Sequence, residues 1–531
     1  MKNLKRQNPG QLFVAQELIN KVIKLNYSVA ELRMNYFLKY ILLLTTLIPL
    51  SLTAQETVEY DGVSYYIHPD GRVIVQSCST DVVGSIDIKE SIFHNGKNLS
   101  ITEIGNGAFY QCNKITEIKI PASILKINDR AFAYCTNLES ISIPNSVIKI
   151  GSYSFQACRS LKIATLGNAV ESIGDFAFLS CEKLTEIVVP NSVVNIGNDV
   201  FSSCYELKSA ILSDSLSTMG EAVFYGCRNL SSVNIPSSLS SVSKDTFGEC
   251  KSLTEIIIPN SITTIGDGAF ARSGLLSIVL PNTVTSIGYQ AFCECENIEN
   301  LIIPNAVKSI GKLAFCGCTS LKYIQIPASI TFIGENAFQE CNNLTEVDIM
   351  DIASWCNIDF ENIKNQDYSN PLRIATTLYV NGEKVSNLII PNGVKSIPND
   401  AFYNCSNIEI LTIPQSTTEI GNFAFGNCDA LKEVVCYNPE PPICGDYTFN
   451  TPYSKILKVP FGTQKTYEIA PIWKKFNIQE MSDAGTEDIP VEEVRIEVSR
   501  YDVNGRAVDA NYKGFVIIRY SDGSTTKMMS K

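Results

Sequence analysis

The sequence predicts a β-rich repeat solenoid of about 14 coils of 23 residues, with a β-hairpin cap at the N-terminus and a small β unit at the C-terminus. The first observation is a column of phenylalanines spaced 22 to 24 residues apart, with one gap. The second is a shared pattern close to LxxIxIPxSVxxIGxxAFxxC, clearly copied at 253–270. One such unit cannot bury its own apolar face, so neighbouring units must stack. The column consists of Phe109, Phe132, Phe155, Phe178, Phe201, Phe224, Phe247, Phe270, Phe292, Phe315, Phe338, Phe402, Phe425 and Phe449.

Each coil is predicted to hold two short strands and a turn. The LxxIxI stretch alternates between core and surface, as a strand does. Pro259 ends this stretch, because proline cannot donate to a continuing ladder. The segment from Ile262 to Ile265 predicts the second strand, after which Gly266 turns the chain. The Ala-Phe-xx-Cys segment is expected to form a tight helical or 3₁₀ turn that drops the Phe270 ring into the interior.

Residues 1–54 are expected to be a leader with a signal peptide. Lys39 precedes an apolar run from Ile41 to Thr53, which is shorter than the roughly 20 residues that span a bilayer. Cleavage is expected after Ala54, and a translation start at Met34 would give a leader of ordinary length. Removal of this segment leaves 36 basic and 53 acidic side chains, a net charge of −17. We expect no transmembrane span in the remaining chain.

The rest of the chain divides by its pattern into six parts. Residues 55–100 form an N-terminal β cap, with turn signals at Tyr60-Asp61-Gly62 and Pro69-Asp70-Gly71. Repeats occupy 101–350, an insert occupies 351–384, and further repeats with a C-terminal cap occupy 385–480. An acidic linker follows at 481–494, and a β tail with a turn at Asn504-Gly505 occupies 495–531.

The insert admits two interpretations. It combines a helical turn near Trp355 with a hairpin that turns at Asn381-Gly382. Loops inserted into solenoids often lie on one face, so the insert could be a binding island. The alternative is an aberrant coil whose Trp355 packs on the core. We favour the aberrant coil, because an aromatic residue with apolar neighbours is usually buried.

The repeat, with IGxxAFxxC after a strand that ends in IP, resembles the BspA-like family (the TpLRR subclass) over roughly residues 101–480. The resemblance implies an α/β-type leucine-rich repeat solenoid and a monomeric secreted or cell-surface protein. It also implies adhesion to protein ligands such as host extracellular-matrix proteins or bacterial surface proteins. The tail resembles the C-terminal sorting tails of the type IX secretion route, which implies the outer surface of a Gram-negative bacterium. A plain β appendage is the alternative for the tail.

Composition argues against several kinds of chemistry. With 43 basic against 55 acidic side chains, there is no basic surplus to meet the phosphates of a nucleic acid. The two histidines, His68 and His94, both fall in the predicted cap, and each is expected to be a surface or cap residue and not a general base. The glycine pairs at 105–107 and 266–268 lack the third glycine of a dinucleotide fingerprint. We therefore predict no catalytic residue, no cofactor and no metal, and the protein is not expected to be an enzyme.

The 18 cysteines fall into two groups. Twelve lie three residues after a column phenylalanine, where Ser273 once replaces them, so they are predicted to be buried, reduced spacers. Cys293 and Cys316 lie one coil apart, and reduced thiols, a cross-coil disulfide and a metal site are all open for them. Cys436 and Cys444 bracket a proline-rich turn and are a further disulfide candidate.

The outward-facing strand positions supply a candidate binding face. The fourth residue after the leading leucine is often aliphatic, and the second is often Glu, Ser or Thr. Stacked aliphatic residues would form an apolar stripe, which commonly marks a protein interface; β-propensity is the competing explanation. A glycan-capturing or structural cell-envelope scaffold protein is the alternative function, but the predicted strand face has few aromatic residues. The candidate residues are Val188, Ile211, Glu255, Ile257, Val279, Ile302, Tyr323 and Ile389.

Overall fold

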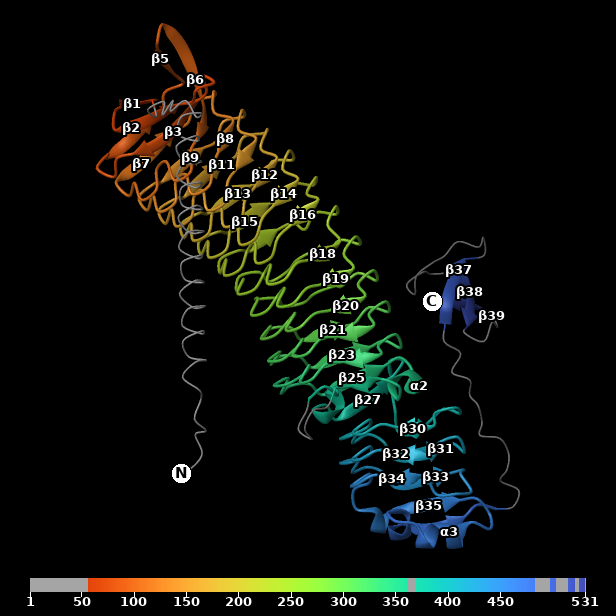
Figure 1. The fold of residues 1–531 in the computed structure, drawn as a ribbon. Helices are drawn as coiled ribbons and strands as arrows, with labels where there is room; N and C mark the ends of the chain where they lie inside the picture. Colours follow the sequence, from red (N-terminus) through yellow and green to blue (C-terminus); the bar gives the residue numbers. More distant parts are fainter. Residues whose placement is uncertain (1–55, 362–367, 483–496, 503–513, 521–524, 531) are drawn as a thin grey trace, which may run out of the picture.

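The computed structural model describes residues 56–361, 368–482, 497–502, 514–520 and 525–530. Its coils stack into a long, curved solenoid (Figure 1) of about 16 turns. The predicted number of 14 coils came from the column phenylalanines. The further turns come from cap strands and from the insert, which have no column phenylalanine. The predicted leader, most of the acidic linker and the Asn504-Gly505 turn lie outside the described residues.

The N-terminal cap begins with three antiparallel strands, β1 (Glu56–Tyr60), β2 (Val63–Ile67) and β3 (Val73–Cys78). The turn between β1 and β2 contains Asp61 and Gly62, both with positive φ. β3 then pairs in parallel with β6 (Lys97–Ile104), whose first half forms a hairpin with β5 (Ser91–His94). β4 (Gly84–Asp87) pairs with the first repeat strand. The cap therefore continues into both sides of the solenoid and covers its first coil.

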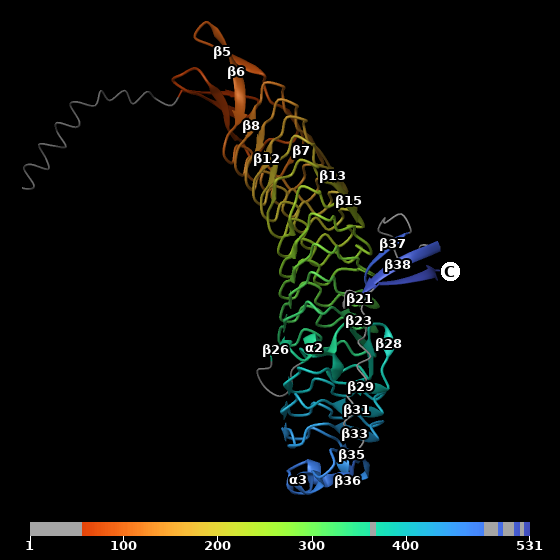
Figure 2. The same cartoon turned by 90° about the vertical axis from the view of Figure 1, so that its right-hand side faces the viewer.

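Two columns of parallel strands run along the solenoid on opposite sides (Figure 2). The first column comes from the LxxIxI stretches: β7 (Ile115–Lys119), β9 (Ser140–Ser142), β11 (Ile163–Thr165), β13 (Glu186–Val188), β15 (Ser209–Ile211), β17 (Ser232–Val233), β21 (Asn300–Ile302), β23 (Tyr323–Ile326), β25 (Glu346–Ile349), β27 (Thr377–Val380), β29 (Asn387–Ile389), β31 (Ile410–Ile413), β33 (Glu433–Cys436), β35 (Ile456–Val459) and β36 (Asn477–Glu480). Equivalent residues of successive coils are in register, as Val188 is with Ile211.

The second column comes from the segment that ends just before the glycine of the repeat pattern. Each of its strands has two residues, and the second residue is usually buried. This column consists of β8 (Lys126–Ile127), β10 (Lys149–Ile150), β12 (Ser172–Ile173), β14 (Asn195–Ile196), β16 (Thr218–Met219), β18 (Ser241–Val242), β19 (Thr264–Ile265), β20 (Ser286–Ile287), β22 (Ser309–Ile310), β24 (Phe332–Ile333), β26 (Asp359–Phe360), β30 (Ser396–Ile397), β32 (Glu419–Ile420) and β34 (Ile443–Cys444).

A third ladder runs through the turns that carry the phenylalanines. The residues two before and two after the ring have positive φ in all 14 phenylalanine coils, for example Arg130 at 56° and Tyr134 at 64° around Phe132. This geometry aims the Phe132 amide at Ser154 O of the next coil, 2.7 Å away. A left-handed L-residue costs about 1–2 kcal/mol, which the inter-coil hydrogen bonds offset. The segment is a series of tight turns rather than a continuous helix: alternate amides donate to the next coil, and those between them close turns, as Cys135 N does to Phe132 O at 3.2 Å.

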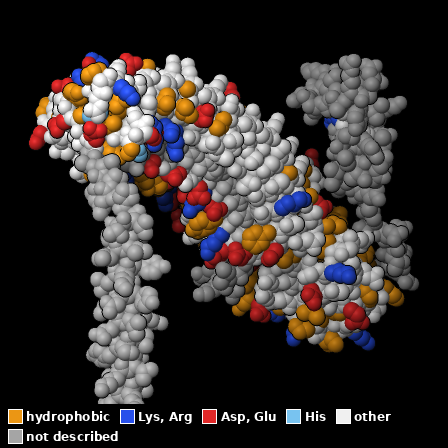
Figure 3. Space-filling view, turned by 45° about the horizontal axis from the view of Figure 1, so that its top comes forward, with side chains coloured by type: hydrophobic (Ala, Val, Ile, Leu, Met, Phe, Trp, Pro, Cys, Tyr) orange, Lys and Arg blue, Asp and Glu red, His pale blue; other side chains and the backbone are white. Residues whose placement is uncertain are grey.

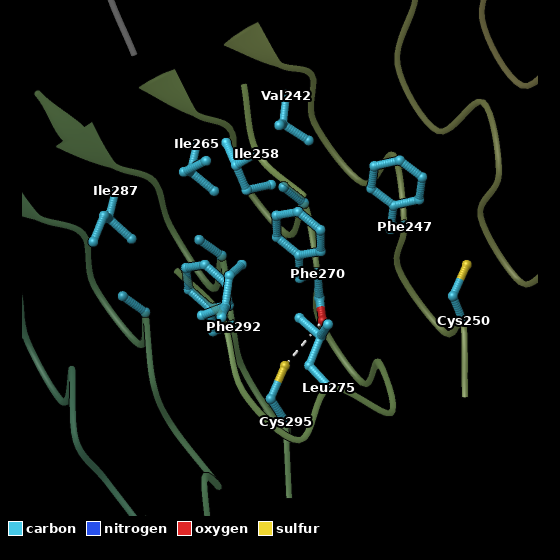
Figure 4. Close-up of a cluster of buried hydrophobic side chains, with 14 of the residues drawn as sticks. Val242, Phe247, Cys250, Ile258, Ile265, Phe270, Leu275, Ile287, Phe292 and Cys295 are labelled. Atoms are coloured by element: carbon cyan, nitrogen blue, oxygen red, sulfur yellow. Dashed lines mark hydrogen bonds between the residues drawn. The ribbon is translucent and has the colours of Figure 1, made fainter. Parts of the chain in front are cut away.

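The phenylalanine rings form a continuous stack in the core. From Phe109 to Phe338, neighbouring ring centroids lie 5.0 to 5.8 Å apart and the rings are within 2° to 19° of parallel. Figure 4 shows Phe247, Phe270 and Phe292 in successive coils, surrounded by aliphatic side chains such as Ile265 and Leu275. Burial of each ring contributes roughly 1.5–3 kcal/mol. The stack thus holds each coil against its neighbours.

The insert replaces a coil. Asp351 caps the short helix α2 (Ile352–Trp355), and β27 forms a hairpin with β28 (Glu383–Lys384) through Asn381-Gly382. Trp355 is buried, and its Nε1 donates to Ala401 O at 2.8 Å. In the regular coils the carbonyl before a column phenylalanine accepts the amide of the preceding column phenylalanine, as Ala131 O does from Phe109 N. The Trp355 Nε1 takes the place of that amide. The segment also contains the 3₁₀ helix η1 (Pro371–Arg373).

The C-terminal cap closes the core with aromatic residues. It contains η2 (Pro452–Ser454), α3 (Gln464–Ile469) and η3 (Trp473–Lys475). Trp473 packs against Phe449 at 5.5 Å, and its Nε1 donates to Pro442 O at 2.8 Å. The tail forms an antiparallel sheet of β37 (Glu497–Asp502), β38 (Gly514–Tyr520) and β39 (Thr525–Ser530).

Candidate binding face

Both histidines of the chain lie in the N-terminal cap. His94 lies 2.8 Å from Glu56 and His68 lies 4.0 Å from Asp70, so both histidines sit in ion-pair contacts of the cap. No group of three or more metal-ligating side chains occurs within the described ranges. Likewise, no helix in the described part of the chain is long and apolar enough to cross a membrane.

The cysteine column has a specific structural role. In the regular coils each Sγ donates to the carbonyl of a phenylalanine one coil back, as Cys295 does to Phe270 O at 3.0 Å (Figure 4). Ser273, which replaces a column cysteine, forms a hydrogen bond through its Oγ with Cys295 Sγ at 3.3 Å. Burial raises the pKa of Cys158 and of Cys204 to about 12. A thiol protonated at neutral pH is unreactive, so this column is structural.

Two pairs of thiols lie in contact across coils, and one pair includes the column cysteine Cys112. The side-chain hydrogen bond between Cys293 and Cys316 lowers the pKa of Cys293 and raises that of Cys316. Cys78 and Cys112 form the same kind of pair between the cap and the first coil, and Cys112 Sγ lies 3.7 Å from Cys78 O. The structure holds all four as free thiols. The sequence did not suggest the second pair, because the two residues belong to different structural units.

The Cys436 and Cys444 thiols each have another hydrogen-bond partner. Cys436 is fully buried and accepts a hydrogen bond from Tyr467 Oη at 3.1 Å. Cys444 Sγ lies 3.7 Å from Pro442 O. Burial raises the pKa of both thiols, to about 11 and about 12. Both are free thiols in the structure, and a disulfide between them stays a prediction.

The aliphatic candidates lie exposed on the first strand column. Five of these residues are 56 % to 86 % exposed, with the largest values at Ile257 and Val279. We call five of them the apolar stripe: Val188, Ile211, Ile257, Val279 and Ile302. Asn234 interrupts the stripe at the equivalent place in one coil, and Ile389 continues the column beyond the insert with 38 % exposure.

The strand ladder is broken in the middle of the apolar stripe. Residues 254–258 and 276–280 carry the LxxIxI pattern but form no strand, so the sheet ends at β17 and restarts at β21. Two local features accompany the break. Asn234 bonds through its side chain to both Leu212 N and Leu212 O, and the coil after Phe270 lacks one residue between Ser273 and Leu275. The second column is interrupted one coil earlier, between β16 and β18, and is continuous from β18 to β26.

Two of the candidate residues differ from the aliphatic ones. Glu255 is exposed beside Ile257 and belongs to the outward polar column. Tyr323 is half-buried, because its Oη donates to Asp348 at 3.0 Å. Asp348 is fully buried and also accepts hydrogen bonds from Gln325 and from Gly382 N of the insert hairpin, each at 3.0 Å. Tyr323 therefore links two coils, and burial together with Asp348 raises its pKa.

Charged side chains are interspersed over the surface, as Figure 3 shows for one face. Many pair between neighbouring coils. Lys162 and Glu139 are 3.0 Å apart, and Lys432 and Glu409 are 2.7 Å apart at the same repeat position. Exposed pairs of this kind contribute little stability.

These features define a leucine-rich repeat solenoid protein. The family model described as BspA type leucine rich repeat region matches residues 102–229, 171–299, 285–376 and 372–470. The chain belongs to this family of BspA-type leucine-rich repeat proteins.

One solved structure shows the same fold, and two others are reported as similar. A leucine-rich repeat protein from Bacteroides ovatus is 26 % identical, with a TM-score of 0.56, and the match covers 80 % of this chain and all of that one. A leucine rich cell surface protein from Faecalibacterium prausnitzii is 23 % identical, covering 72 % and 94 % of the two chains, with a TM-score of 0.40. The T. pallidum leucine rich repeat protein is 23 % identical, covering 50 % and 91 %, with a TM-score of 0.29. Comparison with the curated proteins gives no match.

Proposed function

We propose that this protein is a non-enzymatic binding protein of the cell surface that recognises other proteins through the apolar stripe. The observation that carries the proposal is the exposure of five aliphatic residues at one repeat position, 56 % or more each, with Asn234 at that position in one coil. Contiguous exposed apolar surface is uncommon on a soluble protein unless something covers it.

The position of the two most exposed residues argues against β-propensity as the explanation. Val and Ile are favoured in strands because they pack well on a pleated surface. Ile257 and Val279 lie in stretches that form no strand, yet they are 86 % and 82 % exposed. Strand formation therefore does not account for aliphatic residues at these places. A binding partner would account for these aliphatic residues, because binding would remove their exposed surface from water.

The partner class that best fits is a protein of the host extracellular matrix or of another bacterial surface, which the family resemblance implied. The predicted leader and sorting tail support export to the outer surface of a Gram-negative bacterium, where such partners are present. The net charge of −17 without the leader favours partners with a neutral or basic contact surface. The protein would act as a monomer that presents one long face.

The test is surface plasmon resonance of the full chain on immobilised fibronectin, laminin and type I collagen, and its adhesion to whole bacterial cells. Ile257→Asp with Val279→Asp should weaken binding at least tenfold, because a charge would be buried without a partner. Ile163→Asp is the matched control, since Ile163 is 54 % exposed on the same column but lies outside the stripe. Equal loss in both variants, or no binding to any of these surfaces, would contradict the proposal.

A further inference from the structure

A second site lies far from the apolar stripe, where the insert meets the first coil that follows it. Two cavities of about 170 and about 340 Å³ adjoin there and share Arg373, Asn399 and Asp400. Arg373 comes from η1, and the other two residues follow β30. The larger cavity extends over the next two coils, beside β32 and β34, near the C-terminal end of the solenoid in Figure 1.

Asp400 places a buried carboxylate oxygen without a hydrogen-bond partner at this site. The residue is 6 % exposed, and its Oδ2 accepts a bond from Arg373 Nη1 at 2.9 Å. Its Oδ1 is buried and has no hydrogen-bond partner. A buried carboxylate oxygen without a donor is costly and uncommon. Because Asp400 lines both cavities, a ligand in them could supply the missing donor.

Aromatic rings form one wall of the larger cavity. Tyr403, Phe423 and Tyr447 follow one another in successive coils, with centroids 6.4 and 5.1 Å apart. Arg373 lies over the Tyr403 ring at 5.5 Å. Phe423 covers one face of Tyr447, yet Tyr447 remains 69 % exposed, so its other face is open to a ligand.

The remaining lining is polar and carries both charges. The side-chain oxygens of Asn399 and Asn422 accept hydrogen bonds from backbone amides of the next coil, at 2.7 and 2.6 Å. The NH₂ groups of these two side chains are then the donors that they could offer to a ligand. Asp446 is exposed next to Tyr447. Arg373 is the single cation among these residues and is already paired with Asp400. The lining therefore disfavours an anion and is too polar for a purely apolar ligand.

We propose that this cavity binds a neutral sugar, as a monosaccharide or the end of an oligosaccharide. Sugar hydroxyls would donate to Asp400 and Asp446 and accept from the asparagine amides, while the apolar face of the ring would lie on Tyr447. A volume of about 340 Å³ is within the usual range for small-ligand sites. The site is separate from the apolar stripe, and it does not depend on the proposed protein partner.

Aromatic residues are few on the predicted strand face, which disfavours glycan capture there. The three rings lie instead two residues before the column phenylalanine or one after it, at the turn corner of the coil. Asp400 occupies the same left-handed corner position as Phe423 and Tyr447 in the following coils, with φ of 57°. The hydrogen-bonded turns of successive coils thus place the buried Asp400 carboxylate and the rings of Phe423 and Tyr447 in one row.

The test is isothermal titration of the full chain with cellohexaose, maltohexaose, N-acetylglucosamine hexamer and lactose. We expect at least one of them to bind, with affinity at least tenfold weaker in Tyr447→Ala and in Asp400→Asn. Asparagine keeps the shape of Asp400 and is tolerated at positive φ. Tyr453→Ala is the matched control, because Tyr453 is 74 % exposed and does not line the cavity.

Two further measurements separate this proposal from the protein-binding one. The variant with Ile257→Asp and Val279→Asp should bind the sugar as the unmodified chain does, with the same circular dichroism spectrum. No heat of binding with any of the four sugars at millimolar concentration would overturn the proposal. Equal affinity in the Tyr447→Ala and Tyr453→Ala proteins would overturn it as well.

Discussion

Removing one ring from the middle of the phenylalanine stack should destabilise the solenoid strongly. Phe201 is fully buried, and its ring lies 5.6 Å from both Phe178 and Phe224. A buried Phe→Ala change costs about 3–5 kcal/mol, and two aromatic contacts of about 0.5–1.5 kcal/mol each are included in that loss. We therefore expect Phe201→Ala to lower the free energy of unfolding by about 3–5 kcal/mol, and Phe201→Leu by about 1–3 kcal/mol, since leucine keeps most of the apolar contact.

The assay is urea unfolding followed by two probes. Far-UV circular dichroism reports all coils, whereas the two tryptophans, Trp355 and Trp473, report the insert and the C-terminal cap. Repeat proteins unfold through nearest-neighbour contacts, so Phe201→Ala should shift the dichroism transition more than the fluorescence transition. Phe93→Ala is the control, because Phe93 is 71 % exposed and should change stability by less than about 0.5 kcal/mol. A loss below 1 kcal/mol in Phe201→Ala would refute the stacking argument.

Three other predictions concern the thiols and the insert. Burial raises the pKa of Cys158 and Cys204 from 9.0 to about 12, so the unfolded chain loses these protons at lower pH than the folded chain does. The free energy of unfolding should therefore be at its full value below pH 9. Above pH 9 it should fall by up to about 1.4 kcal/mol per pH unit for each such thiol. Urea midpoints at pH 8 and pH 10.5 check this, and alanine at both cysteines should reduce the fall; a fall unaffected by those changes would contradict it. Oxidised glutathione should link Cys293 to Cys316 with release of two molecules of glutathione, seen as a cross-linked peptide by mass spectrometry and absent in Cys293→Ser; failure to form that peptide would count against the pairing. Trp355→Phe keeps the ring but removes the donor to Ala401 O, and should cost about 1–3 kcal/mol by urea unfolding; an unchanged midpoint would show that the hydrogen bond is unimportant.

The repeated features of the fold could be predicted from the sequence because each coil meets the same environment. The phenylalanine column, the buried cysteines and the strand alternation all recur at one spacing, so a single coil explains the others. The insert was also interpretable, since Trp355 and the Asn381-Gly382 turn have strong local preferences.

Other features depend on contacts that the local pattern does not encode. Tyr134 and Glu249 adopt left-handed backbone conformations, although neither residue favours them, because neighbouring coils supply the hydrogen bonds. The break in the first strand column had only one visible signal, the 22-residue spacing between Phe270 and Phe292. The bond between Tyr323 and Asp348, and the cavity at Asp400, need residues brought together from separate coils.

The stacked phenylalanine core carries an apolar stripe, and beneath this stripe the first strand column is interrupted between β17 and β21. Hydrogen–deuterium exchange of the full chain tests it most directly. The account predicts that amides at 255–258 and 277–280 exchange much faster than those of β13 and β15, while Ile265 and Ile287 of the second column stay protected. Slow exchange at 255–258 and 277–280, equal to that of β13 and β15, would contradict it.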